Sequence, residues 1–444
     1  VSHYDINNNL VNTYAPTSTS PVAESNGYHG GDYVQNAISN ALPGETVKLG
    51  DGIYEVDTGI TIAKAITLQS VNGATSTTLR PTTTVDKALD ITATGSSTYG
   101  VTISGITFDR LRSGTVFNYA IYDQSADYIT VQNCVFNYIY NRGIMLTSTN
   151  AAFTSGTISN NTFTNGGGSS PASTDAAIDI RATASYAISG ITITGNTITN
   201  QKGKGIYLAG NSTSYKVSSV KITSNTITKP TSYGIQGYTY TDTFTITSNT
   251  ITGCYEDGID IKGTAYTIKK NAITSNLGDG IDVELTSASH LINYNDIYNN
   301  TGYGINVRSD VSTVNAKYNW WGSVTGPAYV AATGASVNVS NPEGTGENIT
   351  DRVTYYEWLY KPKADVIADN AAYYCRAISL STGWNTLSTP IILDASTDTV
   401  DEVVDLAKMT IAYWYDTKDA DADGNYWEQV TTGYELEPCD AIYI

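Results

Sequence analysis

The chain has 444 residues, with 42 acidic against 24 basic ones, and a formal net charge of −18. This excess of negative charge argues against nucleic acid and against an anionic membrane surface as partners. No run of 18 or more apolar residues occurs, so no membrane-spanning segment is predicted. A content of 39 Gly, 34 Tyr and 2 Met is typical of an extracellular β-protein. Because the chain starts at Val1, we expect that a leader peptide has been removed.

Residues 1–31 show no hydrophobic period and are rich in polar residues and Pro, which predicts an N-terminal extended arm. This arm is either a flexible leader or a segment that packs on a neighbouring molecule. Residues 32–42 are predicted to form a short amphipathic helix that ends at Pro43-Gly44. Asp32 is the expected N-cap, with Gln35 three residues further on.

Three strands are expected after this helix, in 44–56, 59–73 and 77–81. The helix end ALPGETV, the phrase GIY and the pair ITI and ITL resemble the first coil of the pectin-lyase-like superfamily of right-handed parallel β-helix proteins. The resemblance covers about residues 40–330. It implies a β-helix whose first coil is covered by the helix, because an open sheet edge would promote aggregation. It implies little about activity.

The next coils are less regular. The segments ISGITFD, VQNCVFN and ISNNTFT align on Phe108, Phe136 and Phe163, at spacings of 28 and 27 residues. Cys134 takes the place of an Asn in its coil and is expected to be a buried small hydrophobic residue. Residues 166–175 are an insertion in one turn. This insertion is interpreted as either a connector or a binding loop.

A short phrase then recurs between residues 188 and 321. Its asparagines are Asn196, Asn225, Asn249, Asn271, Asn295 and Asn319, with last steps of 24, 22, 24 and 24 residues. A Gly-Ile phrase follows each of the first five on the same period. A repeat of about 23 residues, made of short alternating apolar and polar segments, predicts stacked β-coils in which the asparagines form an inward hydrogen-bonded ladder. We therefore predict an all-β fold, a right-handed parallel β-helix of about 11 coils.

The predicted β-helix domain spans 32–336 and ends on NWWGSVTGP, where Trp320 and Trp321 are expected to plug the open end. Residues 337–351 are interpreted as a linker. Residues 352–444 are predicted to form a small C-terminal β-rich, sandwich-like module containing one helix. GWNTLSTPIIL, AYWYD and ELEPCDAIYI in this module resemble C-terminal modules of prokaryotic, often archaeal, surface proteins.

Two pairs of aspartates take equivalent positions in adjacent coils: Asp257 with Asp279, and Asp260 with Asp282. Stacked coils would bring each pair to about 5 Å, the separation of the carboxylates in retaining glycosidases. Three interpretations stay open: solvated turns, a Ca²⁺ site, or the carboxylates of an active site. Against catalysis, no His is near and Arg308 is the nearest basic residue by motif.

A second candidate Ca²⁺ site is DADADG at 419–424, which places three aspartates at alternate positions: Asp419, Asp421 and Asp423. A polar hairpin turn is the alternative. Calcium is therefore the one cofactor considered.

The cysteines and the glycosylation sequences complete the candidates. Cys375 and Cys439 are the expected disulfide of the C-terminal module. Cys254 lies on a predicted turn and is either a free thiol or an intermolecular disulfide. N-x-S/T sequences mark possible glycosylation sites at Asn160, Asn211, Asn299, Asn338 and Asn348.

No phosphate-binding loop, Ser-His-Asp arrangement, zinc-ligand spacing or dinucleotide fingerprint occurs. The first functional hypothesis is a structural cell-envelope protein, a self-assembling S-layer or sheath subunit of archaeal, methanogen-like type. Its expected partners are further copies of itself and possibly glycans. The alternatives are a carbohydrate-active enzyme, a polysaccharide lyase or glycoside hydrolase acting through the four aspartates, and a glycan-binding adhesin.

Overall fold

A computed structural model describes most of the first 363 residues and four strands beyond them. The described residues are 1–13, 28–110, 115–125, 127–168, 175–183, 185–284, 290–308, 313–329, 341–342, 344–355, 358–359, 361–363, 386–388, 413–415, 427–429 and 441–443. The chain divides into two compact units, Val1–Arg376 and Ala377–Ile444, which are treated separately.

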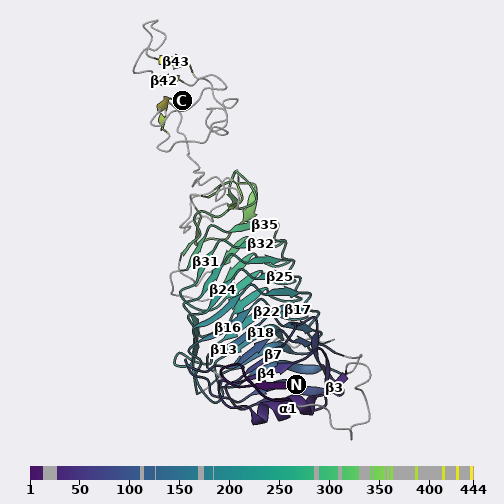
Figure 1. Cartoon of the computed structure of the whole chain (residues 1–444). Coiled ribbons are helices and arrows are strands. Elements are labelled where there is room, and N and C mark those ends of the chain that lie inside the picture. Colours follow the sequence, from purple (N-terminus) through teal and green to yellow (C-terminus); the bar gives the residue numbers. More distant parts are fainter. Residues whose placement is uncertain are drawn as a thin grey trace. The chain divides into compact units, whose positions relative to one another are not determined.

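The first unit is a stack of coils in which each regular coil contributes one strand to each of three parallel sheets (Figure 1). Within the described residues, sheet A has 14 strands in the spatial order β2 (Leu10–Thr13), β1 (Ser2–Tyr4), β4 (Thr46–Leu49), β7 (Thr67–Ser70), β10 (Thr102–Ser104), β13 (Ile129–Gln132), β16 (Gly156–Ser159), β20 (Ile191–Thr194), β24 (Lys221–Thr223), β28 (Thr245–Thr247), β31 (Thr267–Lys269), β34 (Leu291–Asn293), β37 (Val314–Asn315) and β40 (Val353–Thr354).

Sheets B and C follow A in every coil. The described part of sheet B is β3 (Tyr28–Gly30), β5 (Gly52–Val56), β8 (Thr77–Pro81), β11 (Thr107–Phe108), β14 (Val135–Asn137), β17 (Thr162–Thr164), β21 (Thr197–Thr199), β25 (Thr226–Thr228), β29 (Thr250–Thr252), β32 (Ala272–Thr274) and β35 (Asp296–Tyr298). The described part of sheet C is β6 (Ile60–Ile62), β9 (Val85–Ile91), β12 (Phe117–Asp123), β15 (Arg142–Thr147), β18 (Ala176–Arg181), β22 (Lys204–Ala209), β26 (Ile235–Gly237), β30 (Ile259–Ile261), β33 (Ile281–Val283) and β36 (Ile305–Val307).

Two small sheets occupy the remaining turns. Sheet D consists of β19 (Ile188–Ser189), β23 (Val217–Ser218) and β27 (Thr241–Asp242), and β38 (Pro327–Ala328) pairs with β39 (Gly346–Asn348). The predicted all-β parallel coil architecture is confirmed.

The core is built from equivalent positions of successive coils. Along β20, Ile191 and Ile193 are buried while the threonines between and after them are partly exposed, as a period of two requires. The aligned phenylalanines stack face to face, with ring centroids 5.1 Å apart for Phe108 and Phe136 and 4.5 Å for Phe136 and Phe163. The sequence alignment on these three rings is therefore confirmed.

The asparagine ladder also forms as predicted. Oδ1 of Asn225 accepts hydrogen bonds from the backbone N–H and the side-chain Nδ2 of Asn196, both at 2.9 Å. Its own Nδ2 donates to Oδ1 of Asn249 at 3.0 Å and to the carbonyl of Ile193 at 2.9 Å. The same arrangement extends back to Asn161, whose Oδ1 accepts the backbone N–H of buried Cys134. Every buried amide of the ladder is thus satisfied by its neighbours, which favours stability along the whole stack.

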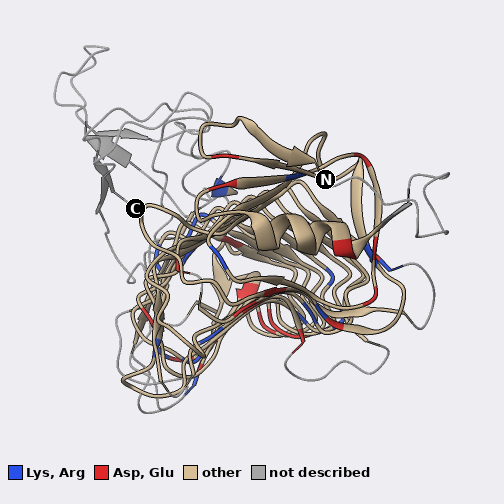
Figure 2. Ribbon diagram, turned by 60° about the horizontal axis from the view of Figure 1, so that its bottom comes forward, with Lys and Arg blue, Asp and Glu red and all other residues tan. Residues whose placement is uncertain are grey.

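Helix α1 (Gly31–Asn40) covers the first coil, as Figure 2 shows from that end of the molecule. The prediction of Asp32 as N-cap is wrong: the N-cap is Gly30, and Asp32 lies inside the first turn, where its charge faces the positive helix end. The side chain of Gln35 donates to the carbonyl of Thr61 and accepts its N–H. Thr61 belongs to the edge strand β6, so the helix supplies the hydrogen bonds of a missing neighbour.

The N-terminal arm forms strands over its described part. Residues 2–4 and 10–13 form an antiparallel hairpin, and its first strand, β1, pairs with β4 of the same chain. His3 Nε2 lies 2.6 Å from Glu45 Oε2 in a buried contact. Residues 1–13 therefore pack on the first coil of their own chain. They extend sheet A past its first coil.

The far end also differs from the prediction, because strands continue into the segment interpreted as a linker. Gly346–Asn348 pairs with β38, and Val353–Thr354 extends sheet A through β37. Trp321 is fully buried beneath this added coil, and Trp320 is partly buried. The end is therefore closed by chain beyond residue 344 together with Trp321.

The second unit contains, among its described residues, an antiparallel sheet in the order β41 (Thr386–Ser388), β44 (Ala441–Tyr443), β42 (Tyr413–Tyr415) and β43 (Trp427–Gln429). Strands β41, β42 and β44 fall in the quoted segments GWNTLSTPIIL, AYWYD and ELEPCDAIYI. The predicted helix and a second layer of a sandwich lie outside the described residues. In the described part of the chain, no helix has the length and hydropathy needed to cross a bilayer.

Candidate functional site

Many charged and aromatic side chains lie on the outward-facing side of sheet C. Three rows of outward side chains run along it, because parallel strands in register stack equivalent residues. The central row is Asp90, Tyr122, Met145, Asp179, Tyr207, Gln236, Asp260, Asp282 and Asn306. The first flanking row is Lys87, Tyr119, Arg142, Ala176, Lys204, Tyr233, Asp257, Asp279 and Tyr303. The second is Thr147, Arg181, Ala209, Tyr238, Lys262, Glu284 and Arg308.

These rows change character along the axis. From β9 to β22 they carry four cations and two carboxylates, and we call this part the basic half. From β26 to β36 they carry two cations and five carboxylates, and we call this part the acidic half. Figure 2 shows the acidic residues in red stacked on successive coils.

Cations lie over tyrosine rings throughout the basic half. Lys87 Nζ is 4.2 Å from the ring centre of Tyr122, and the Arg181 guanidinium is 4.8 Å from that of Tyr207. The Arg142 guanidinium also donates to the hydroxyl of Tyr119 at 3.0 Å. Such contacts hold the aromatic rings and the positive charges in one layer, at about 0.5–2 kcal/mol each.

Asp179 is the anchor of this half. Its side chain is fully buried and accepts from Arg142 Nε at 2.5 Å, from Arg181 Nε at 2.8 Å and from Arg181 Nη2 at 2.7 Å. A buried carboxylate needs such partners, because an unpaired one would cost several kcal/mol. The two guanidinium groups are therefore fixed in place before any ligand arrives.

Burial also sets the protonation of the neighbours. It raises the pKa of Tyr207 above the usual phenol range and lowers the pKa of Lys204 below the usual amine range. Tyr207 therefore remains a neutral hydroxyl at neutral pH. The basic half can offer hydroxyl and guanidinium donors to an anionic or polyhydroxylated ligand.

In the acidic half, Asp260 and Asp282 are adjacent in register. Both are buried, with 1% and 4% of their surface exposed, because neighbouring side chains cover them; neither is a solvated turn residue. Gln236 Nε2 donates to Oδ2 of Asp260 at 2.5 Å, and Arg308 Nη2 donates to Oδ2 of Asp282 at 3.2 Å. Burial raises the pKa of both, that of Asp260 to about 7.

The carboxylates of Asp257 and Asp279 support the turns. Oδ1 of Asp257 accepts the backbone N–H of Asp279 at 2.6 Å. Oδ1 of Asp279 accepts the backbone N–H of Tyr303 at 2.6 Å, and its Oδ2 accepts from Asn306 at 2.9 Å. Burial raises the pKa of Asp257 to about 7. The four aspartates are brought near one another, but these hydrogen bonds direct two of them at backbone.

Asp260, Asp282 and Glu284 offer carboxylate oxygens within 4.8 Å of one another, a possible cation site among the described residues. Oδ1 of Asp260 and Oδ1 of Asp282 are buried and have no hydrogen-bond partner. Lys262 and Arg308 already pair with Glu284, both at 2.5 Å. Three carboxylates against two cations leave one negative charge, which one proton would balance. The all-oxygen set also suits Ca²⁺, but it supplies fewer than the six to eight oxygens that this ion takes.

Cys254 lies in the turn between β29 and β30, as predicted, and of its two predicted states it is the free thiol. The residue is fully buried, and its backbone N–H donates to Oδ1 of Asn276 at 3.0 Å. Asn276 continues to Asn300 and then to Glu347, so Cys254 begins a second inward ladder as Cys134 begins the first. A buried thiol of raised pKa is inaccessible to a second molecule, which removes the intermolecular disulfide.

The remaining candidates from the sequence are the glycosylation sites, the predicted disulfide and the second predicted Ca²⁺ loop. Asn160, Asn211, Asn299 and Asn348 are exposed, as an attached glycan requires, and their glycosylation stays a prediction. Asn338, the pair Cys375 and Cys439, and the loop of Asp419, Asp421 and Asp423 lie outside the described residues.

Sequence reasoning missed the basic half. Among its members only Tyr207 lies in one of the recurring Gly-Ile phrases, GIYL at 205–208. Lys87, Arg142, Asp179 and Arg181 lie in coils whose turns vary in length, so their alignment is not visible as a period. The apolar-polar alternation of 85–91 and 176–181 was the available signal.

Comparison with known proteins agrees with the fold. The family model for a right-handed β-helix region matches residues 69–219 and 215–351. No curated protein matches the sequence. Among solved structures, ORF18 of Geobacillus virus E2 is 13% identical with a TM-score of 0.44, covering 65% of this chain and 53% of that one. The present chain therefore spans about half of that protein.

Two further structures are modules of mannuronan C-5 epimerases of Azotobacter vinelandii. The AlgE6 A-module is 13% identical with a TM-score of 0.44, covering 73% of this chain and 94% of that one. The AlgE4 A-module is 15% identical with a TM-score of 0.43, covering 65% and 90%. Similarity this distant says nothing about activity. The family match covers well over half of the sequence, and the chain belongs to the family of proteins with a right-handed β-helix region.

Proposed function

We propose that this is an extracellular glycan-binding protein that holds an acidic polysaccharide against the basic half of sheet C. The observation that carries the proposal is the alternation of fixed cations and tyrosines over five coils: Lys87 with Tyr122, Arg142 with Tyr119, and Arg181 with Tyr207. Lys87 pairs with Asp90, and Arg142 and Arg181 pair with Asp179. The rows still carry two more cations than carboxylates, which favours an anionic ligand over a cationic one.

The chemistry of a charged sugar matches this surface. Carboxylates form strong charge-assisted hydrogen bonds with guanidinium groups. Sugar rings present apolar faces and hydroxyls, which suit the ring and the O–H of tyrosine. Tyr119, Tyr122 and Lys87 are only partly buried and are therefore accessible to a ligand.

The overall charge of −18 affects how the binding of an acidic polysaccharide should depend on salt. A polyanion is repelled at long range, so binding must depend on close contact with the basic half. Since exposed charges are screened within about 8–10 Å at physiological salt, moderate ionic strength weakens the repulsion more than the close contacts. We therefore expect binding to persist, or to strengthen, between low and moderate salt.

The test is calorimetric titration of the full chain with a uronic-acid oligosaccharide, such as oligogalacturonate, and with a neutral oligosaccharide of equal length. We expect only the acidic ligand to bind. The double variant Lys87→Ala/Tyr122→Ala should bind the acidic ligand at least tenfold more weakly, a loss of about 1.4 kcal/mol.

The acidic half provides a matched control, because Lys262 lies over Tyr238 in the same geometry, 5.0 Å from the ring centre. Lys262→Ala with Tyr238→Ala removes the same groups and should leave the affinity unchanged. Equal loss in both double variants, or equal binding of neutral and acidic ligands, would overturn the proposal.

An enzyme acting through the four aspartates is not proposed. Asp257 and Asp279 accept hydrogen bonds from turn backbone, and Asp260 and Asp282 are buried. These carboxyl groups are therefore poorly placed to reach a glycosidic bond.

The second candidate is a structural subunit of a cell envelope, an S-layer or a sheath. The observation that favours it is the uninterrupted ladder from Asn161 to Asn319, which makes the coils a rigid building block. Electron microscopy of the purified chain, with and without Ca²⁺, tests this role. Sheets or tubes would support it, and a permanently monomeric protein would exclude it.

A further inference from the structure

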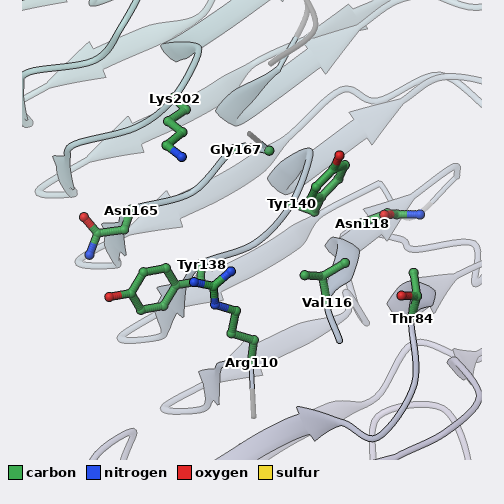
Figure 3. A pocket seen from close by; sticks show the side chains of 10 residues that line it. Thr84, Arg110, Val116, Asn118, Tyr138, Tyr140, Asn165, Gly167 and Lys202 are labelled. Carbon is green, nitrogen blue, oxygen red and sulfur yellow. The ribbon is translucent and has the colours of Figure 1, made fainter. Parts of the chain in front are cut away.

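A hollow of about 610 Å³ lies beside the basic half, in the turns that lead from sheet B into sheet C (Figure 3). Five successive coils line it, from Thr84 to Lys202. The residues that matter for its chemistry are Arg110, Asn118, Tyr138, Tyr140, Asn165 and Lys202. Its volume is in the range of small-ligand sites, about 300–1,000 Å³.

The hollow carries two exposed cations. Neither Arg110 nor Lys202 forms an ion pair within the described residues. The adjacent carboxylate of Asp109 accepts the backbone N–H of Arg110 at 2.8 Å, and that of Asp86 accepts from Asn118 at 3.1 Å. Both carboxylates thus have hydrogen-bond donors of their own, while the two side-chain cations remain available to a ligand.

Two tyrosines are exposed between these cations. Tyr138 and Tyr140 expose 40% and 39% of their surface. The Arg110 guanidinium stacks on Tyr138, 4.4 Å from its ring centre. Tyr138 also has a φ of 56°, a backbone conformation that bulky residues rarely adopt. The equivalent residues of the next three coils, Asn165, Asn200 and Lys229, have φ values of 53°, 53° and 52°, so this conformation belongs to the regular turn after sheet B. It turns the ring of Tyr138 toward solvent.

Glycines keep the hollow open. A Cβ on Gly168 would lie 2.7 Å from Cζ of Tyr140, and one on Gly167 would lie 2.1 Å from the carbonyl oxygen of Lys202. The GGG run of the insertion at 166–175 therefore fits this place because it lacks side chains. Gly167 and Gly168 line the hollow, and residues 169–174 of the insertion lie outside the described residues.

We propose that this hollow is a second glycan subsite, which binds the sugar carboxylates of an acidic oligosaccharide through Arg110 and Lys202 and its rings through Tyr138 and Tyr140. The inference rests on the proposed function and names the ligand class, a uronic-acid oligomer. Arg110 and Lys202 lie three coils apart, roughly 14 Å at 4.8 Å per coil. A monosaccharide cannot contact both, so an oligosaccharide must lie along the helix axis.

The test is titration of the full chain with oligogalacturonates of increasing length and with the same oligomers after reduction of their carboxyl groups. We expect the wild type to bind long oligomers more tightly than the monomer, and to lose the difference when the carboxyl groups are reduced. Arg110→Ala with Lys202→Ala should weaken binding of the long oligomer at least tenfold. Lys221→Ala with Lys270→Ala, two exposed cations elsewhere, is the charge-matched control and should bind as the wild type does.

A second variant keeps the charges and narrows the hollow. Gly168→Ala displaces the ring of Tyr140 and should also weaken binding of the long oligomer, with an unchanged melting temperature showing that the fold is intact. The subsite proposal would be overturned if the Arg110/Lys202 variant and the Gly168 variant both bound the long oligomer with wild-type affinity. If Lys87→Ala/Tyr122→Ala still lost affinity in the same experiment, the proposed function would stand. No binding of any uronate by the wild type would overturn both.

Discussion

The basic and acidic halves of sheet C are built alike and differ in charge balance. Each half has a buried Asp in the central row, and a cation lies near it on an adjacent coil or in a flanking row. Each half also has a tyrosine whose ring lies under a Lys or Arg. In the basic half one fully buried carboxylate, Asp179, has two arginines. In the acidic half Asp260, Asp282 and Glu284 share Lys262 and Arg308. At the same strand positions, the basic half therefore has an excess of positive charge that favours an anion. The acidic half has an excess of negative charge that favours a proton or a cation.

This difference shows how a repeat scaffold separates stability from specificity. The inward asparagines and isoleucines repeat with little change and hold the coils together. The outward positions vary freely, because the hydrogen bonding of the sheet does not depend on them. Function can then change by altering the ratio of charges on one face. The predictions below test whether the two halves depend on their charges as differently as proposed.

The largest effect is expected from neutralising the central carboxylate of each half. Asp179→Asn leaves Arg142 and Arg181 close together and without their counter-charge, so the free energy of unfolding should fall by about 3 kcal/mol or more. Asp282→Asn relieves repulsion, and Arg308 keeps Glu284 as its partner, so the change should stay within about 1 kcal/mol. Chemical denaturation of both variants measures the difference. Equal destabilisation would contradict the contrast between the halves.

A smaller effect is expected from pH. The pKa of Asp260 is raised in the folded protein to about 7, against about 3.9 when unfolded, so between these values the folded state binds more protons. The contribution of Asp260 to stability must then decrease as the pH rises from about 4 to 7. We expect a loss on the order of 2 kcal/mol, because the coupled carboxyl groups share the effect.

The control for this prediction is Asp260→Asn, which cannot titrate. The pKa of Glu347 is also about 7, raised by burial, and it adds a slope of the same sign to both proteins. Only the difference between the wild type and Asp260→Asn is therefore informative. A variant with the same pH dependence as the wild type would show that the proton is not held at Asp260.

The smallest effect is expected from calcium. Above pH 8, where the acidic half has lost its proton, Ca²⁺ at tenfold excess over its dissociation constant should stabilise the fold by about 1.4 kcal/mol. Thermal denaturation with and without the ion measures this as a small rise in melting temperature. The rise should vanish in Asp260→Asn with Asp282→Asn. A rise that survives both substitutions would place the ion elsewhere in the chain.

The sequence predicted those features that depend on repetition. The period of Asn196 to Asn319 and the alignment of Phe108, Phe136 and Phe163 follow from coils of nearly constant length, so stacking could be deduced from spacing alone. The neighbourhood of Asp260 and Asp282 was predicted for the same reason. The burial of these two aspartates was not predicted. It depends on side chains of adjacent coils, such as Arg308 and Gln236, and the spacing of residues in the sequence does not show where those side chains point.

The basic half could not be predicted in the same way. Turns of different length separate β9, β12, β15 and β18, so Lys87, Arg142 and Arg181 share no visible period. The burial of Cys254 within its turn was not predicted, because TGCYEDG contains turn residues that are usually exposed, although Asn276 and Asn300 occupy the equivalent positions of the next two coils. That equivalence was the signal for an inward position. Hairpin β1–β2 depends on contacts with β4 that are distant in sequence.

The central claim is that an acidic glycan lies on the basic half, and side-chain footprinting tests it directly. Hydroxyl-radical oxidation of the full chain, read by mass spectrometry with and without oligogalacturonate, compares Tyr119 and Tyr122 with Tyr238 of the acidic half. The account predicts that the ligand protects Tyr119 and Tyr122 from oxidation and leaves Tyr238 unchanged. Protection of Tyr238 alone, or equal protection of all three rings, would contradict it.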